Sequence, residues 1–211
     1  MRNGEIEMLN HQLKKISVED IRMLQDKFNL SEVLIKNVIE GVIEIEKNGE
    51  FFLVEGFVGL LLSGALYSYT LSTDIVSDKK IKNVSCLFCN ELYGDLCPVI
   101  PSNKYIRFVI ENKPINHESR PVIKSVIKSK ILILDILKIT QYDYIQNIIH
   151  AYYRRFPELS EKLIEVIGIN NIREKKRKIY ELFPDVFRYY SDKTISNYFK
   201  INYSSWKNTH I

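Results

Sequence analysis

The sequence predicts an α+β protein in which an N-terminal antiparallel β jelly roll precedes a long helix and a C-terminal helical domain. Three observations lead to this fold class. Short β-rich runs punctuated by Gly and Pro fill the middle of the chain, apolar residues then recur at helical spacing, and two short helix-like segments end the sequence. We expect a barrel with N-terminal helices over residues 1–140, a long helix over 141–170 and a helical domain over 171–211.

The bulk composition is that of a folded protein without a membrane span. Of the 211 residues, 45% are hydrophobic and 27% are charged, and no apolar run approaches the roughly 20 residues that cross a bilayer. The N-terminal MRNGEIEML lacks an apolar signal core, and three cysteines, an odd number, argue against a disulfide framework. We therefore expect a cytoplasmic protein that does not contact the membrane.

The segment over residues 5–46 is expected to be helical. SVEDIRMLQDKF begins with Ser17 and has Asp20 three residues later, which approximates a capping box. Three apolar residues then lie along one face: Ile21, Leu24 and Phe28.

Seven candidate strands follow, between Gly49 and about Leu134. They are the runs EFFLVEG, FVGLLLSG, ALYSYTLS, NVSCLFC, KYIRFVIE, PVIKSVIK and SKILILD, with Gly and Pro between or beside them. Short strands at this spacing favour an antiparallel sandwich or barrel, and a jelly roll is the closed form that we expect.

Helical periodicity returns from about Thr140. Apolar residues recur at alternating intervals of four and three, as in a coiled-coil seam. They are Ile145, Ile149, Tyr152, Phe156, Leu159, Leu163 and Val166, and the first six are candidates for a dimer interface. Pro157 within this stripe predicts a kink or a restart of the helix. The stripe is expected to pack against the barrel, a second subunit, or both.

Positive charge is concentrated at the C-terminal end. Residues 171–211 hold nine Lys or Arg against four Asp or Glu, a net charge of +5, whereas the whole chain carries +4. A basic segment on a near-neutral body suits a polyanionic partner, since each cation set against a phosphate releases condensed counterions. For REKKRK alone, the alternative is a solvated helix face.

The terminal SDKTISNYFKINYSSWKNTHI has the pattern of a helix-turn-helix. Counted from Asp192, the core positions of such a motif hold Ile195, Phe199, Ile201 and Trp206, and Ser196 supplies the small residue that close helix approach requires. Two positions depart from it. Lys200 lies at the turn, where Gly is favoured for its positive φ, and Thr209 lies at a late core position that is usually larger and apolar.

A second helix from about Tyr203 to His210 would present four side chains outward: Tyr203, Ser204, Lys207 and Asn208. Residues near the start of a recognition helix meet base edges in the major groove, where Asn bonds adenine and Lys reaches guanine. Lys193 and Thr194, at the start of the preceding helix, are candidates for contacts to backbone phosphates.

These segments resemble the Crp/Fnr family of bacterial transcription regulators, in its divergent branch without a strict cyclic-nucleotide signature. REKKRKIYELFPDVFRYYSDKTISNYFKINYSSWKN resembles that branch's basic helix, aromatic-Pro step and helix-turn-helix. GEFFLVEG and LLLSGALYSY are similar to its early barrel strands. The resemblance implies a cyclic-nucleotide-binding-like barrel and a homodimer joined along the long helix. Such a dimer would bind a two-fold symmetric promoter site and recruit or block RNA polymerase.

Two departures from the family pattern limit what the resemblance implies. Asn208 stands where the family commonly places an Arg, so the usual half-site does not follow. NELYGDLCPVIPSNKYIRF contains no counterpart of the family's phosphate-binding cassette, and its nearest basic candidate, Arg107, lies inside an expected strand. Cyclic AMP is therefore not expected as a ligand, and no cofactor is predicted.

Metal and enzymatic sites are not predicted. Cys86, Cys89 and Cys97 form C-x2-C-x7-C, which raises the question of a metal or iron-sulfur site. Three thiolates leave one ligand missing, His117 is a lone loop residue, and the first two cysteines lie in an alternating apolar run that predicts buried, inert thiols. The carboxylates of Glu91 and Asp95 have no cooperating His or nucleophile in the pattern, and no Gly-rich phosphate loop occurs.

Two functions remain open at this stage. The first is a dimeric transcriptional regulator whose barrel transmits a signal to the terminal helices. The second is a β-barrel module that binds a small ligand or a protein, with a C-terminal helical motif that serves association only. Sequence-dependent, salt-sensitive binding of double-stranded DNA would distinguish them.

Overall fold

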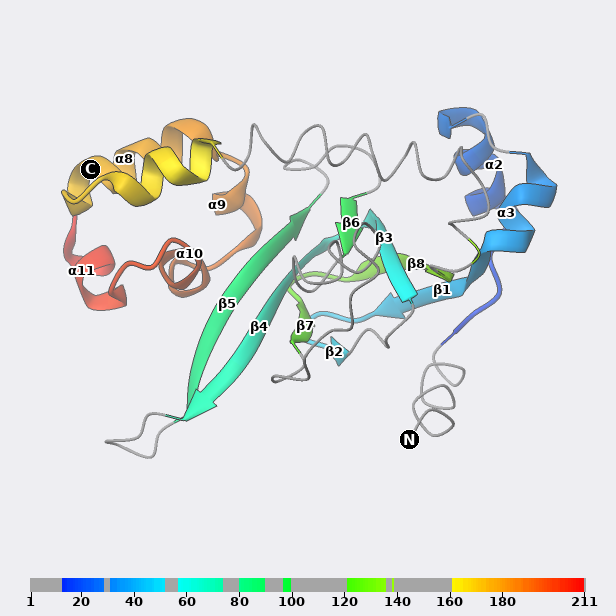
Figure 1. Ribbon diagram of the computed structural model, residues 1–211, viewed down its shortest axis with the longest axis horizontal. Helices are drawn as coiled ribbons and strands as arrows, with labels where there is room; N and C mark the ends of the chain where they lie inside the picture. The colour runs from blue at the N-terminus through cyan, green and yellow to red at the C-terminus, as the bar shows by residue number, and fades with distance from the viewer. Residues whose placement is uncertain are drawn as a thin grey trace.

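The computed structural model describes residues 13–28, 31–51, 57–73, 80–89, 97–99, 121–135, 138 and 161–210. Helices at the two ends of the molecule flank a central body of strands (Figure 1). The helices are α2 (Val18–Phe28), α3 (Glu32–Val38), α8 (Ile172–Leu182), α9 (Val186–Tyr189), α10 (Asp192–Tyr198) and α11 (Tyr203–Asn208), and residues 161–168 are also helical. The strands are β1 (Ile39–Ile45), β2 (Glu50–Phe51), β3 (Phe57–Ser63), β4 (Ala65–Thr73), β5 (Lys80–Cys89), β6 (Cys97–Val99), β7 (Val122–Ser125) and β8 (Ser129–Asp135).

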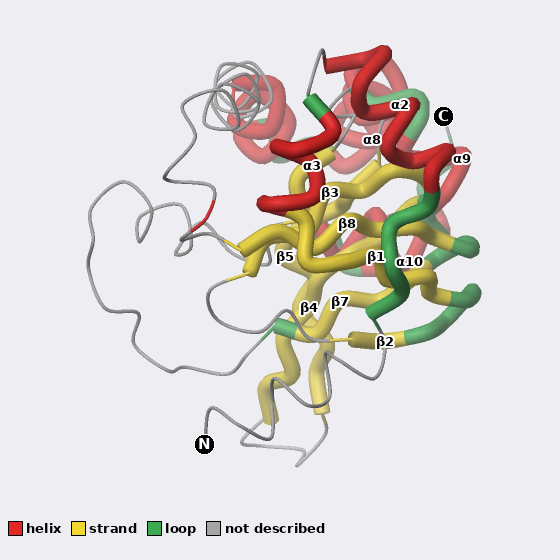
Figure 2. Tube along the Cα trace, turned by 90° about the vertical axis from the view of Figure 1, so that its right-hand side faces the viewer, coloured by secondary structure: helices red, strands yellow, loops and turns green. Residues whose placement is uncertain are grey.

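The described strands form two antiparallel sheets, with the orders β1-β8-β3-β6 and β2-β7-β4-β5. Figure 2 shows β1, β3 and β8 above β2, β4 and β7. A core of apolar side chains lies between them: Ile43, Ile45, Leu61, Ile131 and Ile133 from the first sheet, and Phe51, Leu66, Phe88 and Ile123 from the second. This arrangement confirms an antiparallel β body within a mixed α and β chain.

Strand β8 has an unbroken apolar run because both faces of its sheet are covered. Ile131 and Ile133 point into the core between the sheets, whereas Leu132 and Leu134 pack against the N-terminal helices. A strand that is buried on both faces reads as a continuous hydrophobic segment rather than as an alternating one.

Helix α2 is tied to the first sheet by the predicted capping box. The Asp20 backbone N–H donates to Ser17 Oγ at 3.1 Å, and Ser17 Oγ in turn donates to the Asp20 carboxylate at 2.6 Å. That carboxylate also accepts hydrogen bonds from Lys130 Nζ on β8 at 2.7 Å. Since Asp20 is buried and the cation reaches it, the helix start is fixed to the sheet.

The helical prediction for residues 5–46 is wrong at residues 13–17, where Lys14 forms a β-bridge with Val42, and at its C-terminal end. Helix α3 stops at Val38, and β1 begins at Ile39 and pairs with β8. Val42 faces the N-terminal helices, whereas Ile43 and Ile45 face the core between the sheets. The Val and Ile residues of IEGVIEI suit a pleated, buried surface, and this tertiary context decides their conformation.

The strand predictions fall into three groups. β3, β4, β5, β7 and β8 coincide with predicted runs, and β2 covers the start of EFFLVEG. Strand β6 was not predicted, because its Pro98 indicated a turn; it lies at the end of its sheet order, where a missing N–H is tolerated. KYIRFVIE lies outside the described residues, as do Pro157 and the apolar stripe before residue 161.

The outer face of the second sheet carries the C-terminal helices. Five residues of β4 and β5 belong to one buried cluster with the helical residues: Ala65, Tyr69, Val84, Leu87 and Cys89. The helical side of the same cluster is Val166, Ile179, Phe183, Val186, Tyr190, Ile195, Phe199, Ile201 and Trp206. The C-terminal helices therefore share a continuous hydrophobic core with the sheet.

Substitution of Gly64 by Ala is expected to destabilise the fold. Gly64 has φ +107°, and a Cβ atom there would lie 2.2 Å from Ser129 Oγ and 2.7 Å from its Cα. We expect a loss of about 2–3 kcal/mol in the free energy of unfolding, measured by urea denaturation. Gly168→Ala is the control, because a Cβ atom at Gly168 meets nothing within 4 Å. Equal stability of the two variants would contradict this reading of the β3–β4 connection.

Candidate nucleic-acid interface

The last two helices, α10 and α11, form a compact corner that we call the terminal helix pair. Each helix has a side-chain cap. Ser191 Oγ accepts from the Thr194 backbone N–H at 3.3 Å, and Asn202 Oδ1 accepts from the N–H groups of Ser204 and Ser205. Such caps satisfy amide groups that have no partner inside a helix, so the sequence specifies where each helix starts.

The turn between the two helices passes through Lys200, whose φ is +57°. The Lys200 N–H donates to Asn197 O at 3.1 Å, and the Ile201 N–H donates to Ser196 O at 2.8 Å. The sequence placed Lys200 at the position where Gly is favoured, and the backbone there is left-handed, as that position requires. Lys200 adopts this conformation at a cost in free energy that Gly would not incur.

The expected core of the terminal helix pair is buried. Ile195, Phe199, Ile201, Trp206 and Ser196 are each at most 9% exposed. Thr209, the predicted misfit, is half-buried, and its hydroxyl donates to Ser205 O at 2.7 Å. Its polar group is therefore satisfied within α11.

Trp206 fixes α11 to α8. The Lys176 ammonium lies 4.8 Å from the indole centroid and donates to Trp206 O and Thr209 O at 3.2 and 2.8 Å. The ring of Phe187 stacks on the Trp206 indole, with ring centroids 6.2 Å apart. Within the described part of the chain the indole Nε1 has no hydrogen-bond partner, so aromatic burial outweighs the loss of one polar contact here. One lysine of the REKKRK run is thus structural.

The four residues predicted to face outward on α11 are all exposed. They are Tyr203, Ser204, Lys207 and Asn208. The caps and the buried Trp206 fix the helix that carries them, so these side chains form one defined surface patch. Lys207 supplies its positive charge, and α11 itself contains no acidic residue.

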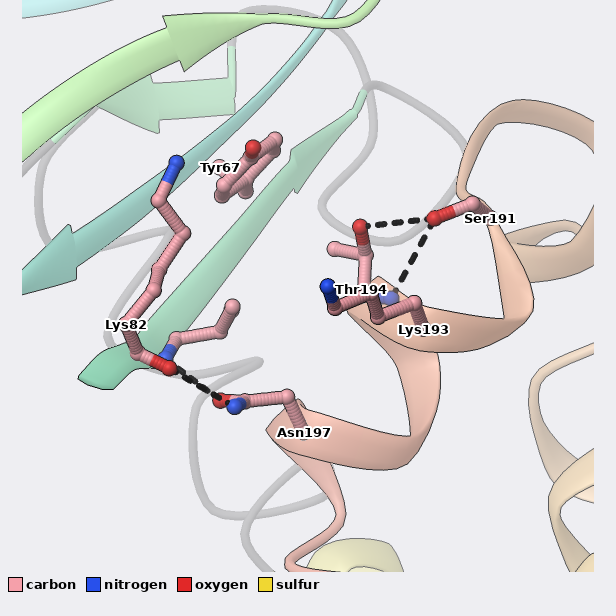
Figure 3. Close-up of a pocket in the computed structure, with 7 residues that line it drawn as sticks. Tyr67, Lys82, Ser191, Lys193, Thr194 and Asn197 are labelled. Atoms are coloured by element: carbon pink, nitrogen blue, oxygen red, sulfur yellow. Dashed lines mark hydrogen bonds between the residues drawn. The ribbon is translucent and has the colours of Figure 1, made fainter. Parts of the chain in front are cut away.

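Lys193 and Thr194 lie elsewhere, at the start of α10, where they border a hollow against the β4–β5 hairpin (Figure 3). Lys193 is exposed and Thr194 is half-buried. The Thr194 hydroxyl lies 3.0 Å from Ser191 Oγ, and its N–H is occupied by the cap. Of these two residues, Lys193 has the free end that can reach an outside anion.

Sequence reasoning missed the residues that dock the terminal helix pair on the sheet. Asn197 Nδ2 donates to Lys82 O at 2.8 Å, and Asn197 Oδ1 accepts from the Val84 N–H at 2.6 Å. Lys200 Nζ donates to Val84 O at 3.3 Å. These partners are more than 110 residues apart in the chain, and no local pattern announces such a contact.

Tyr190 provides a further link, which joins α9 to strands β4 and β5. Its buried hydroxyl lies 2.9 Å from Leu66 O and 2.8 Å from Phe88 O, so one O–H is shared between two carbonyls of paired residues. Leu66 and Phe88 also belong to the core between the sheets. Tyr190 therefore connects α9 to residues whose side chains line the core between the two sheets.

The cysteines do not form a common site in the described region. Cys89 belongs to the cluster under the C-terminal helices, whereas Cys86 packs against the core between the sheets, so the two thiols lie on opposite faces of β5. Burial raises the pKa of the Cys86 thiol to about 11. Cys86 is therefore a neutral thiol at pH 7. The side chain of Cys97 lies outside the description, as do His117, Glu91, Asp95 and Arg107.

Comparison with solved structures identifies the fold. A regulator from Eubacterium rectale assigned to the Crp/Fnr family matches at TM-score 0.54 and 17% identity, over 87% of this chain and 82% of that one. The c-di-GMP responsive global regulator CLP of Xanthomonas campestris matches at 0.53 and 9%, over 83% and 86%. FixK2 of Bradyrhizobium japonicum matches at 0.51 and 11%, over 79% and 80%.

The chain has the fold of the Crp/Fnr regulators. No family model matches the sequence, and no curated protein matches it. Of the described helices, none is long and apolar enough to span a membrane.

The turn at Lys200 yields a test that separates backbone strain from side-chain contact. Lys200→Gly and Lys200→Ala both remove the Nζ contact to Val84 O, but only Gly adopts a left-handed φ without strain. We expect the Gly variant to be more stable than the Ala variant by about 1 kcal/mol in chemical denaturation. An Ala variant as stable as the Gly variant would contradict the assigned turn.

Proposed function

We propose that the protein is a transcriptional regulator that binds double-stranded DNA through the terminal helix pair, acting as a helix-turn-helix with α11 in the major groove. The observation that carries this proposal is the exposure of all four predicted contact residues on a helix fixed by buried neighbours. A recognition helix needs both properties, since its side chains must be free while its backbone is held in register.

The contact residues divide into two roles in this proposal. Asn208, Lys207 and Ser204 would meet base edges, and Tyr203 would contact the backbone or a base near the helix start. Lys193, with Thr194 beside it, would contact backbone phosphates. The +5 charge of residues 171–211 supports a polyanionic partner.

We further propose that the protein acts as a homodimer on a two-fold symmetric site. The candidate interface residues Ile145, Ile149, Tyr152, Phe156 and Leu159 lie outside the described part of the chain, and Leu163 is half-buried against the intrachain core. On the described helix over 161–168, Ile164 and Ile167 are 70% and 51% exposed. A second copy of this helix would cover that apolar pair.

The two sheets would form a jelly-roll sensor whose effector is not cyclic AMP, given the missing cassette in the sequence. A change in the two sheets would act on the helices through Tyr190, which connects α9 to β4 and β5, and through Asn197, which connects α10 to β5. The regulator would then recruit or block RNA polymerase according to promoter geometry. A regulatory rather than catalytic role agrees with the structural neighbours, which are transcriptional regulators.

Selection of bound fragments from random duplex DNA, at two salt concentrations, tests DNA recognition. We expect a shared motif with two-fold symmetry. Lys193→Ala should weaken binding to all sequences alike and lower the salt slope by about 1, whereas Asn208→Ala should change the preferred base at one position of each half-site. Fragments without a common motif would instead favour a module in which the terminal helix pair serves association.

Mass measurement in solution tests the dimer. We expect about twice the 24.8 kDa of the chain, and we expect Ile164→Asp to shift the protein towards the monomer, because a buried carboxylate at the interface would be unpaired. Val33→Asp on α3 is the control, since Val33 is also 70% exposed. A wild-type monomer, or equal masses for wild type and Ile164→Asp, would contradict the proposed interface.

A further inference from the structure

A hollow of about 370 Å³ separates the start of α10 from the β4–β5 hairpin. Its walls come from two distant parts of the chain (Figure 3). The strand side consists of Tyr67, Lys82 and Val84, and the helix side of Ser191, Lys193, Thr194 and Asn197. Of these lining residues two are lysines and none is acidic, so the hollow is positively charged.

Among the described residues, Lys82 has no carboxylate that it holds alone. Its ammonium lies 3.5 Å from the Tyr69 ring centroid and 5.6 Å from that of Tyr67, so two aromatic faces orient it. Glu50, the acid that acts on Lys82, is already engaged by Lys124 at 3.2 Å and by the Tyr69 hydroxyl.

Further cations act on Lys82. Burial lowers the pKa of Lys82, and Lys124 and Lys193 lower it further. Asp192, although next to Lys193, acts on the Tyr180 hydroxyl of α8 and does not line the hollow. A group of cations that repel one another is stabilised by an added anion.

We propose that the β4–β5 hairpin is a second arm of the DNA interface, in which Lys82 and Lys193 hold one backbone phosphate between them. This inference rests on the proposed function. It adds Lys82 of β5 to an interface whose sequence-predicted residues all lie on the terminal helix pair. Lys193 is already the proposed phosphate contact of α10, and the hollow extends that contact to the neighbouring strand.

The docking of α10 on β5 favours this arrangement. Asn197 fixes α10 to the backbone of Lys82 and Val84, so that both lysines border the same hollow. A duplex that seats α11 in its groove would present its flanking backbone to this wall.

The test measures DNA affinity and its salt dependence for full-length Lys82→Gln and Lys82→Arg on the selected site. At about 0.1 M salt we expect Lys82→Gln to bind about eightfold more weakly, with a salt slope lower by about 0.9 and the base preference unchanged. Lys82→Arg should retain binding. The matched control is Lys36→Gln, at an exposed lysine of α3 at the opposite end of the molecule (Figure 1), which should bind as wild type.

A double variant tests whether the two lysines share one phosphate. If they do, the slope change of Lys82→Gln/Lys193→Gln should be smaller than the two single changes together, because one phosphate releases its counterions once. Fully additive changes would overturn the shared contact.

The remaining outcomes are also decisive. If wild type binds the site and Lys82→Gln has the wild-type affinity and slope, the hairpin arm is wrong while the proposed function stands. If that variant instead loses a calorimetric signal for inorganic phosphate, the hollow is a small-anion site and the inference is overturned. If wild type binds no duplex, both proposals fail.

Discussion

The side chain of Asn197 is the constraint on which the arrangement of the molecule depends. It accepts from the Val84 N–H and donates to Lys82 O, and so supplies one donor and one acceptor to the exposed side of β5. In the described sheet β5 is an edge strand, whose outward backbone groups need partners once helices cover them. The Asn197 amide thus provides the hydrogen bonds that one peptide unit of a neighbouring strand would provide. The terminal helix pair is therefore held on the sheet by directional hydrogen bonds as well as by apolar contacts.

The hydrophobic core has the same consequence on a larger scale. Residues of β4 and β5 form one buried cluster with residues of the five described C-terminal helices, namely the helix over 161–168 and α8 to α11. A helical unit with its own closed core could move freely on a linker. This unit cannot leave the sheet without exposing part of that core, so any regulatory motion must either preserve the contact or exchange it for another. Tyr190 links this cluster to the core between the two sheets, since its hydroxyl bonds the carbonyls of residues whose side chains lie in that core.

Much of this was accessible from the sequence, for local reasons. The capping pair Ser17 and Asp20 and the burial of Ile195, Phe199 and Trp206 follow from residue types at short spacings. The left-handed turn at Lys200 follows only from its position between the two helical segments, because the lysine itself departs from the motif. The runs that became β3, β4, β5, β7 and β8 were recognisable because turn residues bound them. β1 was not, because IEGVIEI directly continues a helix, and its conformation is decided by pairing with β8, about 90 residues later. The docking role of Asn197 is likewise set by a strand more than 110 residues away.

The position of Trp206 has an optical consequence. It is the single Trp among 13 Tyr, it is fully buried, and its neighbours are Phe187 and the ammonium of Lys176. Selectively excited indole emission therefore originates from one place, the contact between α8 and α11. The chain carries an intrinsic fluorophore that follows the packing of its C-terminal helices without an added label.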